Sequence, residues 1–299
     1  MTVESFKIGV VGAGTMGNGI AHVMALAGFE VTLADISQIS LDKGLVNISN
    51  NLNRQLKKEI ITKSQKEDTI RRISPSTNTE DLKDCDLVIE AVSENFQTKS
   101  TIFKELDQIT SESCLLATNT SSISITKLAS VTKRPDKVIG MHFMNPVPIM
   151  KLIEVIKGYI TSENTVKTIL DIAEEIHKTP VIVNDYPGFI ANRILMPMIN
   201  ESIITLQEGV SGVKEIDTIM KLGMAHPMGP LQLADYIGLD VCHSILSVMH
   251  EEFGSPKYAP CALLTNMVNA GKLGRKTGEG FYIWTTESPE LIVSNQFLK

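Results

Sequence analysis

Short apolar runs recur along the first 185 positions and alternate with stretches of helical periodicity. A run that is apolar at nearly every position is typical of a parallel strand buried on both faces. Strand–helix alternation of this kind predicts a doubly wound α/β sheet of the Rossmann type. The predicted strands cover residues 7–11, 31–34, 86–92, 115–118, 138–141, 151–156 and 180–184, and the clearest helices cover residues 16–27, 47–60 and 161–178.

The pattern changes after Asp185, where the chain becomes mostly helical. The Asp-Tyr-Pro-Gly sequence at 185–188 is turn chemistry. We therefore predict a Rossmann-type domain over residues 1–185 and an all-α domain over residues 186–299. The helices predicted for the second domain cover residues 188–208, 213–222, 229–236, 239–252 and 260–270.

Composition narrows the class of protein. A formal net charge of −6 argues against a general nucleic-acid binder, because phosphate contacts need clustered lysine and arginine. The four cysteines form no CxxC pair, so we expect neither a metal site nor a redox motif. The chain shows no spanning apolar segment and no signal-peptide pattern, so we expect no membrane partner and a cytoplasmic location.

A glycine-rich sequence directly follows the first predicted strand. It reads Gly12-Ala13-Gly14-Thr15-Met16-Gly17 and leads into a predicted helix. In this GxGxxG pattern Gly12 permits a tight turn, Gly14 lets a pyrophosphate approach the backbone, and Gly17 lets the helix pack against the strand. The helix start, including Thr15 and Met16, then directs N–H groups at the phosphates. A glycine turn without a ligand is the alternative, and FAD binding would use the same pattern.

Asp35 ends the second predicted strand, 23 residues after Gly12. A carboxylate at this place accepts hydrogen bonds from the ribose hydroxyls of the cofactor and repels the 2′-phosphate of NADP. Ile36 and Ser37 follow, and no arginine adjoins Asp35. We therefore predict NAD rather than NADP.

Small polar residues, Asn119 to Ser122, follow the strand predicted at 115–118. Ligands of open α/β sheets bind at the carboxyl ends of the strands, so these side chains fall where nicotinamide and substrate would lie. The alternative is a helix cap, in which Ser121 or Ser122 starts a helix over residues 123–129.

His142 and Glu154 each lie six residues from Pro148. Pro148 belongs to a Pro-Val-Pro segment, which cannot continue a central strand. If the chain reverses there, the two side chains come side by side. Glu154 is flanked by apolar residues, and a buried carboxylate needs a partner. Such a pair suits alcohol oxidation, with His142 taking the hydroxyl proton and Glu154 fixing its tautomer. The alternative is a structural histidine and an exposed glutamate.

Seven segments resemble the 3-hydroxyacyl-CoA dehydrogenase family, in particular its short monofunctional 3-hydroxybutyryl-CoA type. The most specific is the one that holds His142 and Glu154. The segments lie between residues 11 and 282 and read VGAGTMG, ENFQTKSTIF, ATNTSS, GMHFMNPVPIMKLIEVI, PGFIANRI, GPLQLADYIGLDV and GRKTGEGFY.

The resemblance implies roles for individual side chains. His142 matches the catalytic base and Glu154 its partner, while Ser121 and Asn145 match residues that contact nicotinamide and the reacting oxygen. Asn192 matches an asparagine with which the second domain completes the site. Further matches to cofactor contacts are Glu94, Lys99, which is also near the thioester, and, more weakly, Lys276.

The resemblance also implies that Lys58, in a helical hairpin inserted after Asp35, contacts coenzyme A. Asn51 matches a second such contact, at a position where relatives often have serine. The hairpin is basic in an acidic protein, which suits the phosphates of coenzyme A. The alternative, which holds for most of these residues, is a solvent-exposed helix pair without a ligand. These basic residues are Arg54, Lys57, Lys58, Lys63, Lys66, Arg71 and Arg72.

We therefore expect reversible NAD-dependent oxidation of an (S)-3-hydroxyacyl-CoA, 3-hydroxybutyryl-CoA first, by a homodimer joined through the second domain. Two alternatives stay open. One is a dehydrogenase of a free hydroxy compound of the gulonate or carnitine type, on the same fold. The other is a non-enzymatic protein that keeps the fold, against which the retained polar residues argue.

Overall fold

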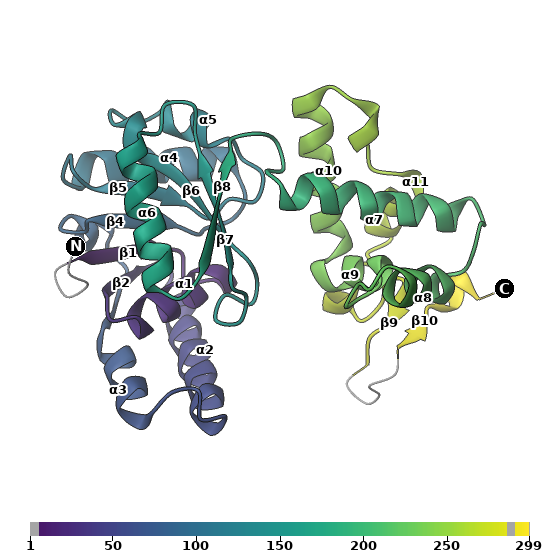
Figure 1. Cartoon of the computed structure of the whole chain (residues 1–299), viewed down its shortest axis with the longest axis horizontal. Coiled ribbons are helices and arrows are strands. Elements are labelled where there is room, and N and C mark those ends of the chain that lie inside the picture. The colour runs from purple at the N-terminus through teal and green to yellow at the C-terminus, as the bar shows by residue number, and fades with distance from the viewer. Residues whose placement is uncertain (1–5, 286–290, 299) are drawn as a thin grey trace. The chain divides into compact units, whose positions relative to one another are not determined.

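The computed structural model describes residues 6–285 and 291–298. The chain divides into two compact units, Met1–Tyr186 and Pro187–Lys299. The division falls one residue after the predicted boundary. Each unit, drawn from purple to teal and from green to yellow in Figure 1, has its own hydrophobic core.

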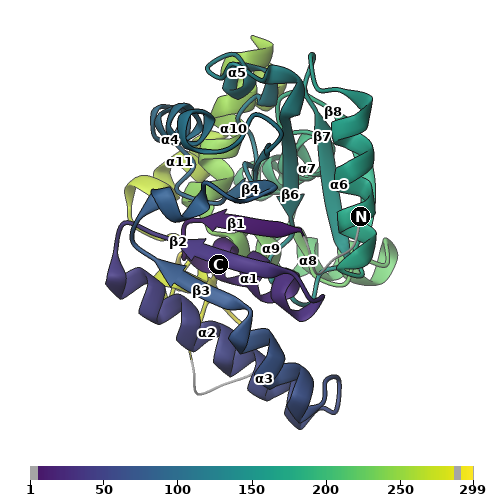
Figure 2. The same ribbon diagram turned by 90° about the vertical axis from the view of Figure 1, so that its left-hand side faces the viewer.

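The first unit is built on an eight-stranded sheet in the order β3-β2-β1-β4-β5-β6-β7-β8, which can be followed in Figure 2. Neighbouring strands are parallel except for the antiparallel pair β6 and β7. This is the predicted α/β class, with an antiparallel step near one edge. The strands are β1 (Lys7–Val11), β2 (Glu30–Ala34), β3 (Ile73–Ser76), β4 (Leu87–Glu90), β5 (Leu115–Thr118), β6 (Val138–Phe143), β7 (Leu152–Lys157) and β8 (Thr179–Asn184).

Helices cover both faces of this sheet. Ile20 and Met24 of α1 and Ile169 of α6 pack in one core with the sheet residues Ile8 and Val155. On the other face, α5 contacts β6 and α4 packs beside α5. The helices of this unit are α1 (Thr15–Leu26), α2 (Gln38–Lys57), α3 (Lys63–Arg71), α4 (Phe96–Ile109), α5 (Ile125–Ala129) and α6 (Glu163–Glu175).

Local chemistry explains where most of these helices begin. Ser37 caps α2 by accepting from Ser40 N–H, so α2 starts nine residues before the predicted position 47. Ser162 caps α6 as predicted, accepting from Thr165 N–H. The cap of α5 is Ser124, so the alternative reading of Ser121 or Ser122 as the helix cap was wrong. Those two serines therefore belong to the loop before the helix.

Strand β3 was not among the predicted strands. It contains Pro75 and is half exposed, because it lies at the edge of the sheet and pairs only with β2. Proline is tolerated at such an edge, since the missing N–H is not needed by an outer neighbour. A short, proline-containing edge strand carries too weak an apolar pattern to be recognised from sequence.

The second unit is a helical cluster with one short antiparallel pair of strands, β9 and β10. Two buried carboxylates hold this pair to the helices. Asp235 accepts from the N–H groups of Phe281 and Tyr282, and Asp217 accepts from the Tyr282 hydroxyl. Burial raises the pKa of Asp235 to about 6. The elements are α7 (Ala191–Gln207), α8 (Val213–Gly223), α9 (Pro230–Ile237), α10 (Leu239–Phe253), α11 (Ala262–Asn269), β9 (Tyr282–Ile283) and β10 (Ile292–Val293).

Candidate functional site

The glycine-rich loop runs from the end of β1 into α1, as predicted. Gly12 has φ +99°, and a Cβ there would lie 2.8 Å from the Ala91 carbonyl oxygen. A Cβ on Gly17 would lie 1.7 Å from the Gly12 carbonyl oxygen, so only glycine lets α1 start this close to the loop. Gly14 caps the helix without a side chain and faces open space. A helix start of this kind fits the pyrophosphate of a dinucleotide.

Asp35 lies at the end of β2, beside the glycine loop. Its Oδ2 accepts from Ala13 N–H at 2.8 Å and its Oδ1 from Ser37 N–H at 2.9 Å. The carboxylate also lines a cavity of about 350 Å³ together with Gly12, Gly14 and residues that follow β4. An acceptor at this rim suits ribose hydroxyls and opposes a phosphate. The residues present therefore fit NAD.

A buried ion pair lies at the carboxyl end of β4. Lys99 of α4 is 1% exposed, and its Nζ donates to Glu90 Oε1 at 2.7 Å and Oε2 at 2.9 Å. Thr118 of β5 donates its hydroxyl to Glu90 Oε2 at 2.7 Å. The network ties the ends of β4 and β5 to α4. Lys99, proposed from sequence as a cofactor contact, is thus engaged by protein carboxylates in this structure.

Glu94 organises the loop that carries Ser121. Its Oε1 accepts from the hydroxyl of Thr120 at 2.5 Å and from the N–H groups of Ser121 at 2.8 Å and Ser122 at 3.0 Å. Its Oε2 lies 3.4 Å from Lys99 Nζ. Glu94 therefore joins the buried ion pair to the serine loop and fixes the backbone on which the Ser121 side chain stands.

His142 and Glu154 lie opposite each other on the antiparallel strands β6 and β7. Glu154 Oε2 is 2.7 Å from His142 Nδ1, and the two residues are 3% and 7% exposed, respectively. The reversal at Pro148 thus has the geometric effect that the sequence predicted. Side chains alternate across a strand, so His142 and Glu154 lie on the same face of the sheet as the paired residues Gly140 and Ile156. This is the face covered by α5, because a Cβ on Gly140 would lie 2.9 Å from Ile125 of that helix.

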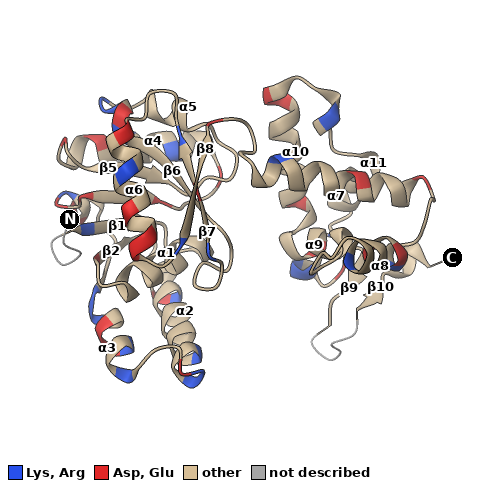
Figure 3. Ribbon diagram, viewed as in Figure 1, with Lys and Arg blue, Asp and Glu red and all other residues tan. Residues whose placement is uncertain are grey.

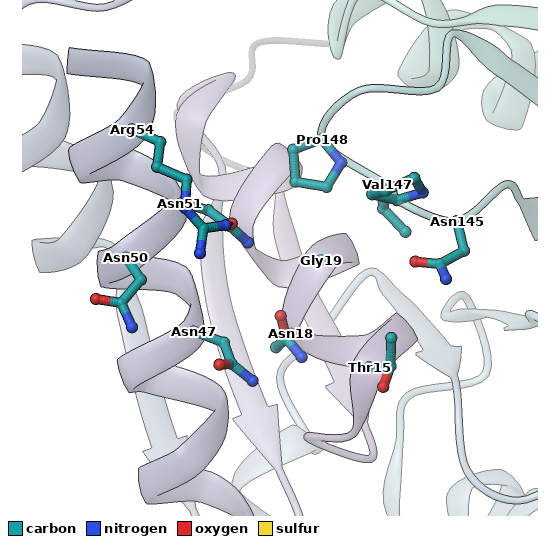
Figure 4. A pocket seen from close by; sticks show the side chains of 11 residues that line it. Thr15, Asn18, Gly19, Asn47, Asn50, Asn51, Arg54, Asn145, Val147 and Pro148 are labelled. Carbon is teal, nitrogen blue, oxygen red and sulfur yellow. The ribbon is translucent and has the colours of Figure 1, made fainter. Parts of the chain in front are cut away.

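The β6–β7 connection borders a second pocket of about 180 Å³ (Figure 4). Asn145, Val147 and Pro148 form one wall, and Thr15 of α1 and Arg54 of α2 lie on others. The pocket is rich in carboxamides, which both donate and accept hydrogen bonds. The remaining lining residues are Asn18, Gly19, Asn47, Asn50, Asn51 and Pro146.

Lysine and arginine recur along the α2–α3 hairpin (Figure 3), and several of them are engaged with acids or carboxamides of the same hairpin. Arg71 pairs with Asp68, and Lys66 donates to Asn53 at 2.7 Å. Arg54 donates to Asn51 Oδ1 at 2.9 Å, which places its guanidinium at the pocket wall. Lys58 follows the end of α2 and is exposed.

Two predicted site residues belong to the second unit. Asn192 lies in the first turn of α7 and is 8% exposed. Lys276 pairs with Asp240 of α10. The first unit alone brings together the glycine loop, Asp35, Glu94 and Lys99 at the carboxyl ends of its parallel strands.

Asn119 lies, as predicted, in the polar segment after β5, and its Oδ1 accepts from Phe143 N–H beside His142 at 2.9 Å. Two further residues escaped the sequence-based prediction. Glu90 anchors Lys99, and Asp185 accepts from Ser124 Oγ and from the start of α5. Glu90 carried a usable signal, because it is an acid at the end of the apolar run Leu87–Glu90 and a buried carboxylate needs a partner.

Within residues 6–285 and 291–298, no helix has the length and apolar character needed to span a membrane. The same described part of the chain holds no group of three or more His, Cys, Asp or Glu side chains able to bind a metal.

Comparison with protein families covers both units. Residues 7–186 match the 3-hydroxyacyl-CoA dehydrogenase NAD binding domain, and residues 188–284 match the C-terminal domain of 3-hydroxyacyl-CoA dehydrogenase. The match to the first model lies on the unit that holds the glycine loop and Asp35.

Known proteins are similar over nearly the whole chain. The 3-hydroxybutyryl-CoA dehydrogenase of Bradyrhizobium diazoefficiens is 50% identical over 283 residues, 95% of this chain and 97% of that protein. The one from Clostridioides difficile is 51% identical over 276 residues, 92% of this chain and 98% of that protein. The crystal structure of (S)-3-hydroxybutyryl-CoA dehydrogenase from Ralstonia eutropha has a TM-score of 0.92 at 48% identity and covers 95% of this chain and 100% of that one.

Proposed function

This chain belongs to the 3-hydroxyacyl-CoA dehydrogenase family, and from that premise we propose that it interconverts (S)-3-hydroxybutyryl-CoA and acetoacetyl-CoA with NAD. The observation that carries the proposal is the 2.7 Å contact between His142 Nδ1 and Glu154 Oε2, in a domain with a dinucleotide-binding loop. The R. eutropha protein, at 48% identity, bears that substrate in its name.

The roles of the two residues follow from their contact. Glu154 accepts a hydrogen bond from His142 Nδ1–H, which leaves Nε2 as the atom that exchanges a proton with substrate. In the oxidation His142 takes the hydroxyl proton, and Glu154 stabilises the imidazolium that results. When bound, NAD would accept the hydride that leaves the carbon bearing this hydroxyl.

Ser121, Asn145 and Asn192 are proposed to orient the reacting oxygen. Ser121 stands on the loop fixed by Glu94, and Asn145 on the connection next to His142. Asn192, from the second unit, stands in the first turn of α7. The proposed cofactor contacts are Gly12, Gly14, Thr15, Met16, Gly17 and Asp35, with Glu94, Lys99, Ser121, Asn145 and Lys276 in addition.

Coenzyme A is proposed to reach the site along the asparagine-lined pocket of Figure 4. Its amide-containing arm has the same donors and acceptors as the carboxamides of the lining. The exposed Lys58, with Asn51 nearby on α2, is proposed to receive its phosphates.

The decisive experiment follows NADH absorbance as purified protein meets acetoacetyl-CoA, with His142→Gln beside it. We expect consumption of NADH that falls by roughly 10²- to 10⁴-fold in the variant, because a general base is lost. No consumption by the wild-type protein with NADH or NADPH would refute the thioester assignment and favour a free hydroxy compound.

A second measurement separates thioester from free hydroxy substrates. Lys58→Ala should raise the KM for acetoacetyl-CoA, and the effect should shrink with added salt because it is electrostatic. Lys104→Ala, which removes the same charge from an exposed position on α4, serves as a matched control with little expected effect. Unchanged kinetics in Lys58→Ala would contradict the proposed route for coenzyme A.

A homodimer joined through the second unit and a cytoplasmic location complete the proposal. Exposed apolar side chains on α8, Ile219 and Leu222, support a protein interface on that unit. Light scattering at micromolar concentration tests the oligomeric state. A single-chain mass would refute the dimer, and cell fractionation tests the location.

A further inference from the structure

The connection between β6 and β7 spans residues 144–151 and carries Asn145. Both strands that flank it carry a member of the His142–Glu154 pair. The connection therefore sets the position of Asn145 relative to that pair. What fixes this short segment in place decides the geometry of the proposed site.

Backbone contacts give the connection part of its shape. The Pro146 carbonyl accepts from the N–H groups of Ile149 at 2.9 Å and Met150 at 3.0 Å. Val147 is 2% exposed, and a Cβ on Gly19 of α1 would lie 2.8 Å from the Val147 Cβ. The segment thus packs closely against α1 at Gly19, and both Gly19 and Val147 line the pocket of Figure 4.

Two carbonyl groups of this turn are held by one ammonium group. Lys178 Nζ donates to the Val147 carbonyl oxygen and to the Met150 carbonyl oxygen, each at 2.6 Å. Hydrogen bonds from a charged donor are about twice as strong as neutral ones. A single side chain therefore bridges both ends of the turn that follows Asn145.

The backbone of Lys178 is itself anchored. It precedes β8, and the N–H of the next residue, Thr179, donates to the Lys151 carbonyl at 2.7 Å. The side chain is half-buried, and burial lowers the pKa of its ammonium group. Burial, and to a smaller extent the charge of Lys178, lowers the pKa of His22 of α1 to about 4.

We propose that Lys178 is a positioning residue, whose ammonium group holds the β6–β7 connection so that Asn145 faces the reacting substrate. This inference rests on the proposed function for the part that concerns activity. Lys178 touches neither substrate nor cofactor, and it acts through the carbonyl groups of Val147 and Met150. Loss of the ammonium group frees the turn while β6 and β7 remain paired.

Lys178→Met removes the donor and keeps much of the aliphatic length. We expect kcat/KM for acetoacetyl-CoA to fall roughly ten- to hundredfold, because displacements of about 1 Å have effects of this size. The dissociation constant of NADH, read from its fluorescence, should change by less than about threefold, because Asn145 is one of many proposed cofactor contacts and the glycine loop and Asp35 lie on other segments. Lys178→Arg, which retains two donors, should recover most of the activity.

Lys137→Met is the matched control. Lys137 is also half-buried and also donates to a backbone carbonyl, that of Glu112, but it precedes the amino end of β6. Its kcat/KM should stay near that of the wild-type protein. An equal fall in both variants, or wild-type kcat/KM in Lys178→Met, would overturn the proposal. A parallel loss of NADH binding and turnover would overturn it as well, since it would indicate general unfolding.

Hydrogen exchange separates this inference from the proposed function. Amides of residues 144–151 should exchange faster in Lys178→Met, while those of the glycine loop should not change. If the wild-type protein does not turn over acetoacetyl-CoA, the proposed function fails, and exchange at 144–151 alone decides the role of Lys178. If Lys178→Met does not fold, Lys178→Gln takes its place with the same expectations, and unchanged exchange there overturns the proposal.

Discussion

Glu154 lies directly across the β6–β7 pairing from His142, with its Oε2 2.7 Å from the imidazole Nδ1. Both side chains are almost fully buried. The antiparallel step in an otherwise parallel run of strands creates this contact, because the two strands face each other across one turn. In the proposed reaction the contact sets which imidazole nitrogen meets the substrate.

Glu154→Gln tests that relationship. A carboxamide can donate to Nδ1 as well as accept from it, so the imidazole loses its fixed tautomer and the imidazolium loses its counter-charge. We expect kcat for acetoacetyl-CoA reduction to fall by roughly 10²- to 10⁴-fold. NADH binding should be retained, and fluorescence titration checks this. Full activity in the variant would leave His142 acting without Glu154 and would contradict the proposed pair.

Asp35 is predicted to set the preference between the two nicotinamide cofactors. The wild-type protein should favour NADH over NADPH, and Asp35→Ser should lower the ratio of their kcat/KM values at least about tenfold, because repulsion of the 2′-phosphate is lost. The ratio is the informative quantity, since Asp35 also binds Ala13 N–H and its loss affects both cofactors alike.

Asp42→Asn provides the control for Asp35. Asp42 is an exposed acid on α2, so its change alters the net charge equally without touching the cavity. Its cofactor ratio should equal that of the wild-type protein. An unchanged ratio in Asp35→Ser would show that Asp35 does not discriminate between the cofactors.

Removing one charge of the Glu90–Lys99 pair is predicted to lower the stability of the protein strongly. Glu90→Gln leaves a buried ammonium group without its main counter-ion, so the free energy of unfolding should fall by about 3–5 kcal/mol. The double variant Glu90→Gln/Lys99→Met should be more stable than the single one, because no charge remains buried. Urea denaturation of the wild-type protein, the two single variants Glu90→Gln and Lys99→Met, and the double variant measures both effects.

An exposed ion pair supplies the comparison. On α3, Lys63 Nζ lies 3.8 Å from Glu67 Oε1, and the two side chains are 82% and 62% exposed, respectively. Glu67→Gln should leave stability nearly unchanged, since exposed pairs contribute little. If Glu90→Gln behaves like Glu67→Gln, the buried network does not hold the strand ends as described.

His22 is predicted to make the first unit less stable in mild acid. It is fully buried, its Nε2 lies 3.1 Å from Gln55 Oε1, and burial lowers its pKa from 6.5 to about 4. A folded-state pKa below the unfolded value means that the unfolded chain takes up the proton first as pH falls. Stability is therefore lost between pH 6.5 and 4, by about 2 kcal/mol at pH 5 relative to pH 7.5.

Denaturation of His22→Gln at both pH values checks this. The variant lacks the titrating group, so the difference between pH 7.5 and pH 5 should be smaller by that amount. His177→Asn is the control, because His177 is exposed and has φ 57°, a conformation that asparagine tolerates. A pH dependence in His22→Gln equal to that of the wild-type protein would be inconsistent with the low pKa.

Several features were determined by the sequence itself, because neighbours along the chain create them. Gly17 has to be glycine because of a contact within the β1–α1 turn, Gly12 has the positive φ of that turn, and Asp35 directly follows the next strand. The reversal between His142 and Glu154 is also local, since proline at 146 and 148 stops the strand and equal spacing brings the two residues into register. A pattern within about two dozen residues sufficed for each.

Only the tertiary structure decided the supports of the site. Lys178 reaches Val147 across 31 positions, Thr118 reaches Glu90 across 28, and Glu94 reaches the Ser121 N–H across 27. These contacts depend on the order of strands in the sheet, which places β8 beside β7 and β5 beside β4. Apolar periodicity states that a strand is buried but not which strand lies next to it, so the partners of its polar residues become known only when the sheet is assembled.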